Sequence, residues 1–376
     1  MSNNRVLIIG MFDSIHIARW ISQFANSNLT IILFPSSHFR HIHSDILKAR
    51  SRNIHIIGAG KLSRSLGYID SLVTFRFFGG RIATVIRRFY LKLTIKILRP
   101  QIIHAIEIQH AGYLIADQVG GSHRRILTNW GSDIYYFTNF DNHKTKIIKA
   151  LKWATHYSAE CERDYALASE LGFSGINLPR IPNAGGFNIF KSEVKCSDRK
   201  LILIKTYGGQ FGAAKIAIKA IANFLSMNHN FEVFFYSVTR DVIKDVEILK
   251  NKFPNLVKFS TIENPLSQEE ILALFQKSRV YLGCSISDGL STSFLQALIS
   301  GAYPIQTNTS CASELTTLGA VGSIINPSAE EILLELNEKI NDEKLLDEAQ
   351  QINLEFSHKY LEKNHVSQIA RDFYEF

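Results

Sequence analysis

Short apolar runs alternate with longer amphipathic stretches along most of this 376-residue chain. The runs are rich in Ile, Val and Leu and are bounded by polar residues, glycine or proline, which is typical of strands buried in a parallel sheet. In the first half of the chain they predict strands at residues 6–9, 29–34, 54–57, 102–105 and 125–128. In the second half they predict strands at residues 201–205, 232–236, 258–261, 280–284 and 303–306. Strands that alternate with helices in this way predict an α/β fold, in which helices cover parallel sheets.

Turn-forming residues separate the two series of strands. The run 178–187, LPRIPNAGGF, contains two prolines, an asparagine and two glycines, too many for a regular element. A new strand pattern opens at residue 201, so we place the domain boundary near residues 190–198. The expected parts are an N-terminal domain over residues 1–190, a C-terminal domain over residues 199–355 and a C-terminal helix over residues 356–376.

The charges divide unevenly between the two halves. Residues 1–198 contain 25 Lys and Arg against 13 Asp and Glu, a net charge of +12, whereas residues 199–376 contain 17 against 21, a net charge of −4. A basic N-terminal half indicates an anionic partner such as a membrane surface or a phosphorylated lipid. Nucleic acid is a less favoured partner, because the chain has no recognised nucleic-acid-binding module and little aromatic interleaving of its basic residues.

The cysteines and the lengths of the apolar runs indicate in which cellular compartment the protein is expected. The four cysteines are scattered, with no CxxC pair and no cluster of histidines at metal-ligand spacing, which indicates free thiols in a reducing environment. The first apolar run is too short for a secretory segment, and no run reaches the roughly 18 apolar residues of a membrane span. We therefore expect a cytoplasmic protein without a leader.

The most informative motif is the run 284–305, CSISDGLSTSFLQALISGAYPI. An acidic residue opens a Gly/Ser/Thr turn, and a helix is predicted to start on that turn. The loop and the helix N-terminus offer unpaired backbone N–H groups and a positive dipole end, which suit a diphosphate. Asp288 and Gln296 flank this position and are placed to hold hydroxyl groups on either side, as in a nucleotide sugar. The expected donor-binding residues of this motif are Ser285, Asp288, Gly289, Leu290, Ser291, Thr292, Ser293 and Gln296.

A second candidate for phosphate binding is the glycine-rich loop 205–215, KTYGGQFGAAK, which follows a predicted strand and enters a helix. Glycines such as Gly209 allow close backbone approach to a phosphate, and Lys215 adds a positive charge in the first helical turn. Lys205 at the start of the loop is a further candidate. The alternative is that the glycines only form turns and that the lysines are solvated.

These two motifs resemble the donor site of retaining glycosyltransferases of family 4. The family pattern is Ser, two residues, Glu-Gly, six residues and a second Glu, then Gly and Pro-hydrophobic. The chain has Ser285, Asp288-Gly289 and Gln296 at the matching places, so Asp and Gln replace the two glutamates. The resemblance implies that the first acid holds the donor sugar and that the second position holds the ribose, for which Gln lacks the strength of a carboxylate. Lys215 matches the family's diphosphate-binding Lys, whereas the family's Arg has no clear counterpart.

The resemblance also implies a fold and a mechanism. The family has two Rossmann-like domains facing each other across a cleft, the GT-B arrangement, and a C-terminal helix that crosses back to the first domain. Phe373 and Tyr374 are candidates to anchor that helix. In the front-face route usually assigned to such enzymes, the departing phosphate helps to deprotonate the acceptor hydroxyl, and the protein stabilises charge and orients two sugars. The chain has no Asp-x-Asp triplet, so we expect neither an essential metal nor a cofactor besides the donor.

Candidate acceptor-side residues follow the strands of the first half, at the sheet edge where open α/β domains bind ligands. Gly10, Asp13 and His16 follow the first strand, although a lone His can equally cap or pack. After the strand at residues 102–105, Glu107 and His110 both match the place of the family's His beside the reactive sugar, and we favour His110. Asp133 follows the strand at residues 125–128 and either positions an acceptor hydroxyl or caps a helix. The expected catalytic residues are His110, Asp288 and Lys215.

A basic amphipathic helix is predicted at residues 81–99, which contain six basic residues and no acid. One apolar face can pack on the sheet and leave basic and apolar residues for an anionic lipid surface, although a solvated basic face is the alternative. At 100° per residue the basic stripe consists of Arg81, Arg88, Lys92, Lys96 and Arg99. The apolar residues beside it are Ile82, Ile86, Phe89, Leu93 and Ile97 on one face, and Leu91, Ile95 and Leu98 on the other.

The expected function is sugar transfer from a nucleotide diphosphate sugar to a glycan or lipid-linked acceptor in cell-surface polysaccharide synthesis, at the inner face of the membrane. A nicotinamide-dependent oxidoreductase is disfavoured, because it needs GxGxxG after the first strand and Gly10 stands alone there. A sugar-nucleotide epimerase of the same architecture stays open. So does a non-catalytic sugar-nucleotide-binding protein, because Gln296 replaces a carboxylate and the Arg is missing.

Overall fold

The computed structural model describes residues 4–25, 27–37, 39, 41–57, 80–118, 121–189 and 193–375, and gives no side chains for residues 80–83. The chain divides into two compact units. Unit 1 consists of Met1–Gly185 and Val366–Phe376, and unit 2 consists of Gly186–His365. The expected boundary near residues 190–198 therefore lies shortly after the observed division, and the last part of the expected C-terminal helix belongs to unit 1.

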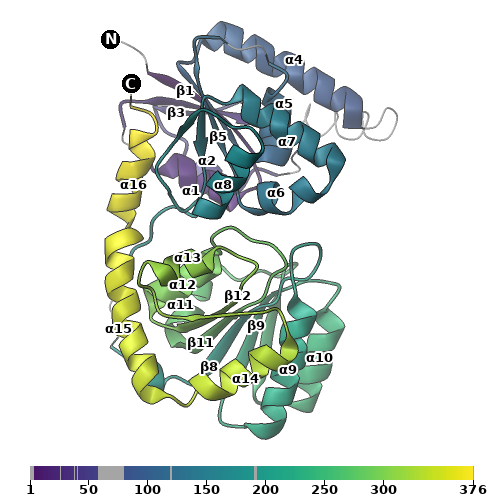
Figure 1. Ribbon diagram of the computed structural model, residues 1–376, viewed down its shortest axis with the longest axis vertical. Helices are drawn as coiled ribbons and strands as arrows, with labels where there is room; N and C mark the ends of the chain where they lie inside the picture. The colour runs from purple at the N-terminus through teal and green to yellow at the C-terminus, as the bar shows by residue number, and fades with distance from the viewer. Residues whose placement is uncertain are drawn as a thin grey trace. The chain divides into compact units, whose positions relative to one another are not determined.

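Unit 1 contains a parallel sheet of seven strands in the order β3-β2-β1-β4-β5-β6-β7 (Figure 1). Strand β1 pairs with both β2 and β4, so the strand order reverses at β1. In open α/β sheets, ligands bind beyond the carboxyl ends of the strands at such a reversal. The strands are β1 (Arg5–Gly10), β2 (Thr30–Pro35), β3 (Ile54–Ile56), β4 (Ile102–Ile106), β5 (Arg124–Thr128), β6 (His156–Ser158) and β7 (Ile176–Asn177).

Alternate side chains of β1 enter two different cores, because successive side chains of a strand point to opposite faces. Val6 and Ile8 pack in the core shared with α1 and α16, whereas Leu7 and Ile9 pack in the core on the other face, shared with α7. The unit 1 helices are α1 (Ile15–Ser22), α2 (Ser44–Lys48), α4 (Gly80–Leu98), the π-helix η1 (Ile108–Gly112), α5 (Tyr113–Ile115), α6 (Ser132–Tyr135), η2 (Phe137–Asn139), α7 (Asp141–Trp153), α8 (Glu162–Glu170) and the unit 1 part of α16 (Lys363–Asp372).

The C-terminal segment is part of the unit 1 core. Phe373 and Tyr374 are fully buried, which confirms them as anchors. Trp20 Nε1 donates a hydrogen bond of 2.8 Å to the Tyr374 hydroxyl, which lies 2.6 Å from His104 Nδ1. Because the Tyr374 oxygen accepts from Trp20, its own hydrogen is directed to His104. Burial lowers the pKa of His104 to about 3, so this histidine is neutral and its Nε2–H donates to Thr128.

Unit 2 contains a parallel sheet of six strands in the order β10-β9-β8-β11-β12-β13, and here the order reverses at β8. The strands are β8 (Leu201–Lys205), β9 (Glu232–Val238), β10 (Val257–Thr261), β11 (Ser278–Gly283), β12 (Tyr303–Thr307) and β13 (Ser323–Ile325). The helices are η3 (Cys196–Asp198), α9 (Ala214–Met227), α10 (Ile243–Lys252), α11 (Gln268–Lys277), α12 (Thr292–Ser300), α13 (Ala312–Thr317), α14 (Ala329–Lys339) and α15 (Glu343–Tyr360). All ten strands predicted from the apolar runs are confirmed. The short strands β6, β7 and β13 were not predicted.

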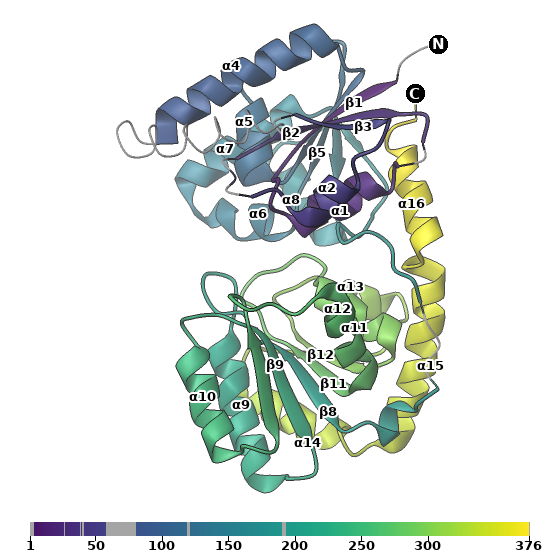
Figure 2. The ribbon, with the colours of Figure 1, turned by 180° about the vertical axis from the view of Figure 1, so that it is seen from behind.

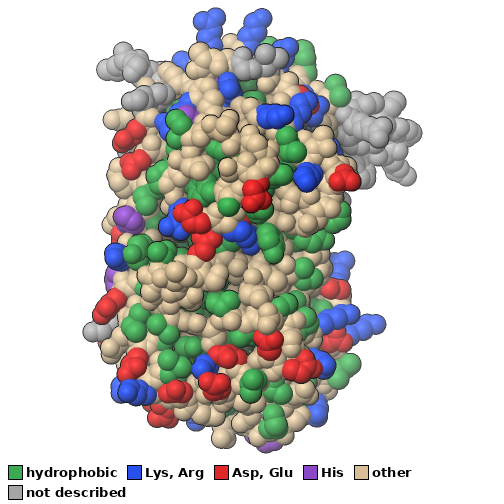
Figure 3. All heavy atoms as spheres, viewed as in Figure 1, with side chains coloured by type: hydrophobic (Ala, Val, Ile, Leu, Met, Phe, Trp, Pro, Cys, Tyr) green, Lys and Arg blue, Asp and Glu red, His purple; other side chains and the backbone are tan. Residues whose placement is uncertain are grey.

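Helix α4 runs along the outside of unit 1 in both views (Figure 1 and Figure 2). Leu91 is fully buried, and Ile95 and Leu98 pack beside it, so this apolar face is the one that covers the sheet. The other apolar face is solvent-exposed and consists of Val85, Ile86, Phe89, Tyr90, Leu93 and Ile97. Figure 3 shows Lys and Arg side chains together with hydrophobic ones over this part of unit 1. None of the helices in the described ranges is long and apolar enough to cross a membrane.

Arg88 was expected in the exposed basic stripe, but the structure places it elsewhere. Its guanidinium forms an ion pair of 2.6 Å with Asp117 and donates to the Tyr113 carbonyl oxygen, so it is directed to the body of unit 1. Lys92, Lys96 and Arg99 are exposed, whereas the Arg81 side chain lies outside the described residues. The basic part of the exposed face therefore consists of these three residues.

Candidate functional site

A strained turn follows β4 at the point where the unit 1 strand order reverses. Glu107 has a φ of 78°, an unfavourable value for a residue with a Cβ, and its side chain is 7% exposed. Its carboxylate accepts the N–H groups of Gln109 and His110, at 2.7 and 2.8 Å, and so caps the π-helix η1. Both π-helices and strained residues of this kind concentrate at functional sites. The turn therefore marks the carboxyl edge of unit 1 as a candidate site.

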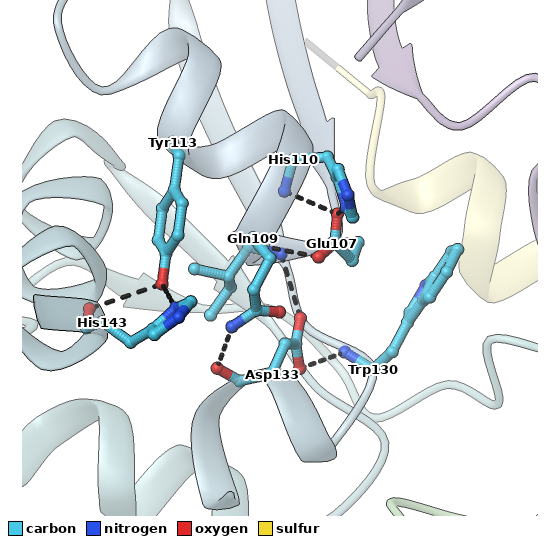
Figure 4. A network of polar contacts seen from close by, with 8 residues as sticks. Glu107, Gln109, His110, Tyr113, Trp130, Asp133 and His143 are labelled. Carbon is cyan, nitrogen blue, oxygen red and sulfur yellow. Dashed lines mark hydrogen bonds and ion pairs between the residues drawn. The ribbon is translucent and has the colours of Figure 1, made fainter. Parts of the chain in front are cut away.

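His110 is the member of this turn that faces outward (Figure 4). Its side chain is 49% exposed, and its Nδ1 lies 2.9 Å from the Glu107 carboxylate. The hydrogen bond to Glu107 raises the pKa of His110, and the Glu107 and Asp13 charges raise it further. Position in the sequence made both Glu107 and His110 candidates for contact with a ligand, and we favoured His110. The structure gives them different environments, because Glu107 is buried and orients His110.

Asp133 lies beneath this turn. Its side chain is 3% exposed, and its two oxygens accept the N–H groups of Ile108, at 3.0 Å, and Trp130, at 2.7 Å (Figure 4). Burial raises the pKa of Asp133 to about 8, and the neighbouring Glu107 carboxylate contributes to the increase. The carboxyl group thus connects the turn after β5 to the turn after β4. It is bound to the backbone and is not presented to an acceptor.

The residues expected after β1 lie at the same edge. Gly10 ends β1, and a Cβ there would lie 2.4 Å from Ile17, so the glycine lets α1 pack against the strand. Asp13 is exposed and close enough to raise the pKa of His110. The His16 ring packs against the Trp130 ring, with centroids 5.2 Å apart. Unit 1 therefore brings together all the acceptor-side residues that the sequence predicted.

In unit 2 the two predicted phosphate loops are hydrogen-bonded to each other. Ile286 N–H donates to the Phe211 carbonyl at 2.7 Å, and Ala213 N–H donates to the Cys284 carbonyl at 3.3 Å. These bonds join the glycine-rich loop after β8 to the Ser/Gly turn after β11, beyond the carboxyl ends of two paired strands. The two candidate phosphate loops therefore lie together at the carboxyl edge of the unit 2 sheet.

The turn after β11 is held by the loop after β12. Ser285 N–H donates to Thr307 Oγ1 at 3.0 Å, and the Ser285 hydroxyl lies 3.3 Å from Thr309 Oγ1. Asp288 N–H donates to the Thr309 carbonyl, and the Asp288 carboxylate accepts the N–H of Gly289 at 2.9 Å. The backbone of the turn is therefore fixed, and Asp288 is half-buried at its tip.

Helix α12 starts directly on this turn. No side chain caps its N-terminus, so the first N–H groups, from Thr292 onward, suit an anion. Leu290 and Ser291 are buried, and the Ser293 hydroxyl accepts from Tyr236 at 2.7 Å, which directs Ser293 into unit 2. Gln296 lies one turn further along α12 and is 6% exposed. Only a small part of Gln296 is therefore accessible to a donor.

Asp241 is a charged residue of this region that the sequence did not reveal. Its carboxylate accepts the Gly209 N–H at 3.0 Å, and a Cβ on Gly208 would lie 2.2 Å from it. Hydrogen bonds from Thr239 and Gly209 lower the pKa of Asp241, and the Lys215 charge lowers it further. Asp241 therefore occupies part of the glycine-rich loop, where the sequence predicted a phosphate. No motif could identify it, because it follows β9, far from the loop in sequence.

The two lysines of the loop differ in environment. Lys215 is exposed in the first turn of α9, close enough to Asp241 to act on its pKa. Lys205 ends β8 and is half-buried, beside the strand that carries the second loop. Lys215 is thus more accessible than Lys205 to a diphosphate that binds from solution.

Known proteins resemble this chain in the sequence of unit 1 and in the fold of both units. Residues 5–158 match the family described as glycosyl transferase 4-like. The whole chain is similar to a sucrose-phosphate synthase from Thermosynechococcus elongatus, with 12% identity, a TM-score of 0.71, and 99% of this chain and 98% of that chain covered. It is also similar to HepE from Anabaena in complex with UDP and glucose, with 13% identity, a TM-score of 0.69 and 99% of each chain covered.

A glycosyltransferase from Rickettsia africae shares 12% identity at a TM-score of 0.66, with 100% of this chain and 98% of that chain covered. No curated protein shows significant sequence similarity to the chain. The structural likenesses extend over both units and therefore concern the complete two-domain fold. Residues 5–158 thus match the glycosyl transferase 4-like family model, and the chain as a whole has the two-domain GT-B fold of these structures.

Proposed function

We propose that the protein transfers a sugar from a nucleotide diphosphate sugar to a glycan or lipid-linked acceptor, with retention of configuration, in cell-surface polysaccharide synthesis. The observation that carries this proposal is the pair of hydrogen bonds that joins the glycine-rich loop to the turn of Ser285 and Asp288. Together with the uncapped start of α12, the joined loops offer N–H groups and Lys215 to a diphosphate. Asp288 is then the residue that holds donor-sugar hydroxyls.

The proposed chemistry is electrostatic. Lys215 and the α12 N-terminus stabilise the charge that develops on the departing diphosphate, and the family resemblance assigns contact with the donor sugar to His110. No enzymic nucleophile is needed if the departing phosphate itself accepts the proton of the acceptor hydroxyl. We further propose that no divalent metal is required, since cationic side chains and N–H groups supply the compensating charge.

We propose that α4 holds the protein on the cytoplasmic face of a membrane. Its exposed face combines Phe89, Leu93 and Ile97 with Lys92 and Lys96, and α4 contains no acidic residue. Apolar side chains that enter the interface and lysines that meet anionic headgroups favour such a surface over water.

A screen of sugar nucleotides for release of free nucleotide tests the transfer. UDP-sugars come first, because HepE from Anabaena has been seen in complex with UDP-glucose. Release that depends on an acceptor and on Lys215 supports the proposal. Donor binding without turnover of any sugar nucleotide supports a second candidate, a non-catalytic binder. The position of Asp241 favours that candidate, because its carboxylate occupies an N–H group of the phosphate loop.

A further inference from the structure

A basic pocket of about 720 Å³ lies in unit 1 beside His110. Helices α4 and α7 form its sides, η1 contributes Gln109 and His110, and α5 contributes Tyr113. Its cationic lining residues are Arg87 and Arg88 of α4 and Lys146 and Lys149 of α7.

One acid accompanies these four cations. Asp117 forms ion pairs with both Arg88 and Lys149, and thus holds one cation from each helix at the same place. These ion pairs, together with the Tyr113 carbonyl that accepts from Arg88, give the pocket a fixed geometry. Three positive charges are left after Asp117 is counted, so the pocket has a strong preference for an anion.

Neutral groups of the pocket also suit an anion. Ser36 lines the pocket and is 4% exposed, and its hydroxyl finds no hydrogen-bond partner within the described ranges. Lys146 lies over the Tyr113 ring, 5.4 Å from its centroid, which directs its aliphatic stem along the wall. A buried hydroxyl without a partner is costly, and a phosphate oxygen would accept its hydrogen.

We propose that this pocket binds a phosphate or diphosphate group of the acceptor. The inference rests on the proposed function, because it names the class of acceptor for that transfer. The pocket lies in unit 1 and the phosphate loops lie in unit 2, so the acceptor's phosphate and the donor's diphosphate have separate sites. His110, the residue proposed above for contact with the donor sugar, also lines the pocket, so a sugar attached to the bound phosphate lies next to His110.

Calorimetric titration with dodecyl diphosphate tests the proposal, with dodecyl glucoside as the neutral probe of equal chain length. Arg87→Gln combined with Lys146→Gln removes one pocket cation from each helix. Lys144→Gln combined with Lys152→Gln removes two exposed charges from α7 outside the pocket and is the matched control. We expect the pocket variant to lose roughly tenfold or more in affinity for dodecyl diphosphate, because charge-assisted hydrogen bonds are lost. The control should keep wild-type affinity, and dodecyl glucoside should not distinguish the three proteins.

Inorganic pyrophosphate distinguishes the sources of the phosphate. Binding of pyrophosphate as strong as that of dodecyl diphosphate, and equally lost in the pocket variant, indicates a water-soluble phosphorylated acceptor. Binding of dodecyl diphosphate alone indicates a lipid-borne one. The inference would be overturned if the control variant lost as much affinity for dodecyl diphosphate as the pocket variant. It would also be overturned if UDP displaced dodecyl diphosphate at UDP concentrations near the dissociation constant of UDP. Failure of the wild type to bind any nucleotide refutes the proposed transfer but leaves the affinity for the diphosphate probe unchanged.

Discussion

The protonation of Asp133 predicts how the free energy of unfolding depends on pH. The pKa of Asp133 is about 8 in the folded protein and 3.8 as its ordinary value. Between these values the folded protein binds a proton that the unfolded chain releases, so the free energy of unfolding falls as the pH rises. The slope is about 1.4 kcal/mol per pH unit, which amounts to about 2.7 kcal/mol between pH 5 and pH 7. Asp133→Asn cannot ionise, so its stability should lack this slope.

Urea denaturation followed by tryptophan fluorescence measures this difference. The three tryptophans, Trp20, Trp130 and Trp153, all lie in unit 1, so the signal reports unfolding of the unit that contains Asp133. An amide also places an N–H group against a backbone N–H, which costs about 1–3 kcal/mol. That cost does not vary with pH, so it changes the offset of the curve and leaves its slope to report ionisation.

Asp45→Asn is the matched control for this experiment. The hydrogen bond from Lys48 lowers the pKa of Asp45, so this carboxyl is ionised in both states above pH 5. The control should therefore have the wild-type slope between pH 5 and pH 7. Parallel profiles for the wild type and Asp133→Asn would show that Asp133 is ionised in the folded protein, which would refute the reasoning.

Three further predictions concern the donor site. Lys215→Ala should lower turnover at saturating donor on the order of a hundredfold without changing stability, because Lys215 is exposed, whereas Lys219→Ala on the same helix should have no such effect. Gln296→Glu should preserve or tighten UDP binding measured by calorimetry and Gln296→Leu should weaken it, and no change with either would remove Gln296 from the site. Turnover should be the same with and without a chelator, and loss that magnesium restores would contradict a metal-independent reaction. For the membrane, reversal of Lys92, Lys96 and Arg99 to Glu should abolish binding to anionic vesicles, since each is worth about 1 kcal/mol, and binding indifferent to salt would contradict the proposal.

The sequence predicted most readily the strands that are nearly continuous apolar runs, such as β1, β2 and β8. Strands β6, β7 and β13 were missed, since HYS, IN and SII each contain no more than two apolar residues and their pairing depends on a neighbour already in place. For α4 the periodicity revealed two apolar faces but could not choose between them. The choice depends on contacts of Leu91 with residues far away in the sequence.

The sequence placed the candidate residues at the ends of strands, but it could not give their environments. Spacing could not separate Glu107 from His110, because neither the positive φ of Glu107 nor a π-helix leaves a recognisable pattern in the sequence. Asp133 was a candidate for acceptor contact until its burial and its two backbone partners were known. Asp241 could not be predicted for a related reason, since only the fold brings it next to Gly209 and no sequence motif contains both residues.

The burial of Phe373 and Tyr374 in unit 1 has a consequence for biosynthesis. A chain that emerges from the ribosome in sequence order presents residues 1–185 first, but Trp20 and His104 then lack the Tyr374 hydroxyl that links them. Unit 2, which is continuous in sequence, can fold to completion before unit 1 does. The nascent first half thus leaves uncovered the apolar residues that pack against Phe373 and Tyr374, a natural point of contact for chaperones during elongation.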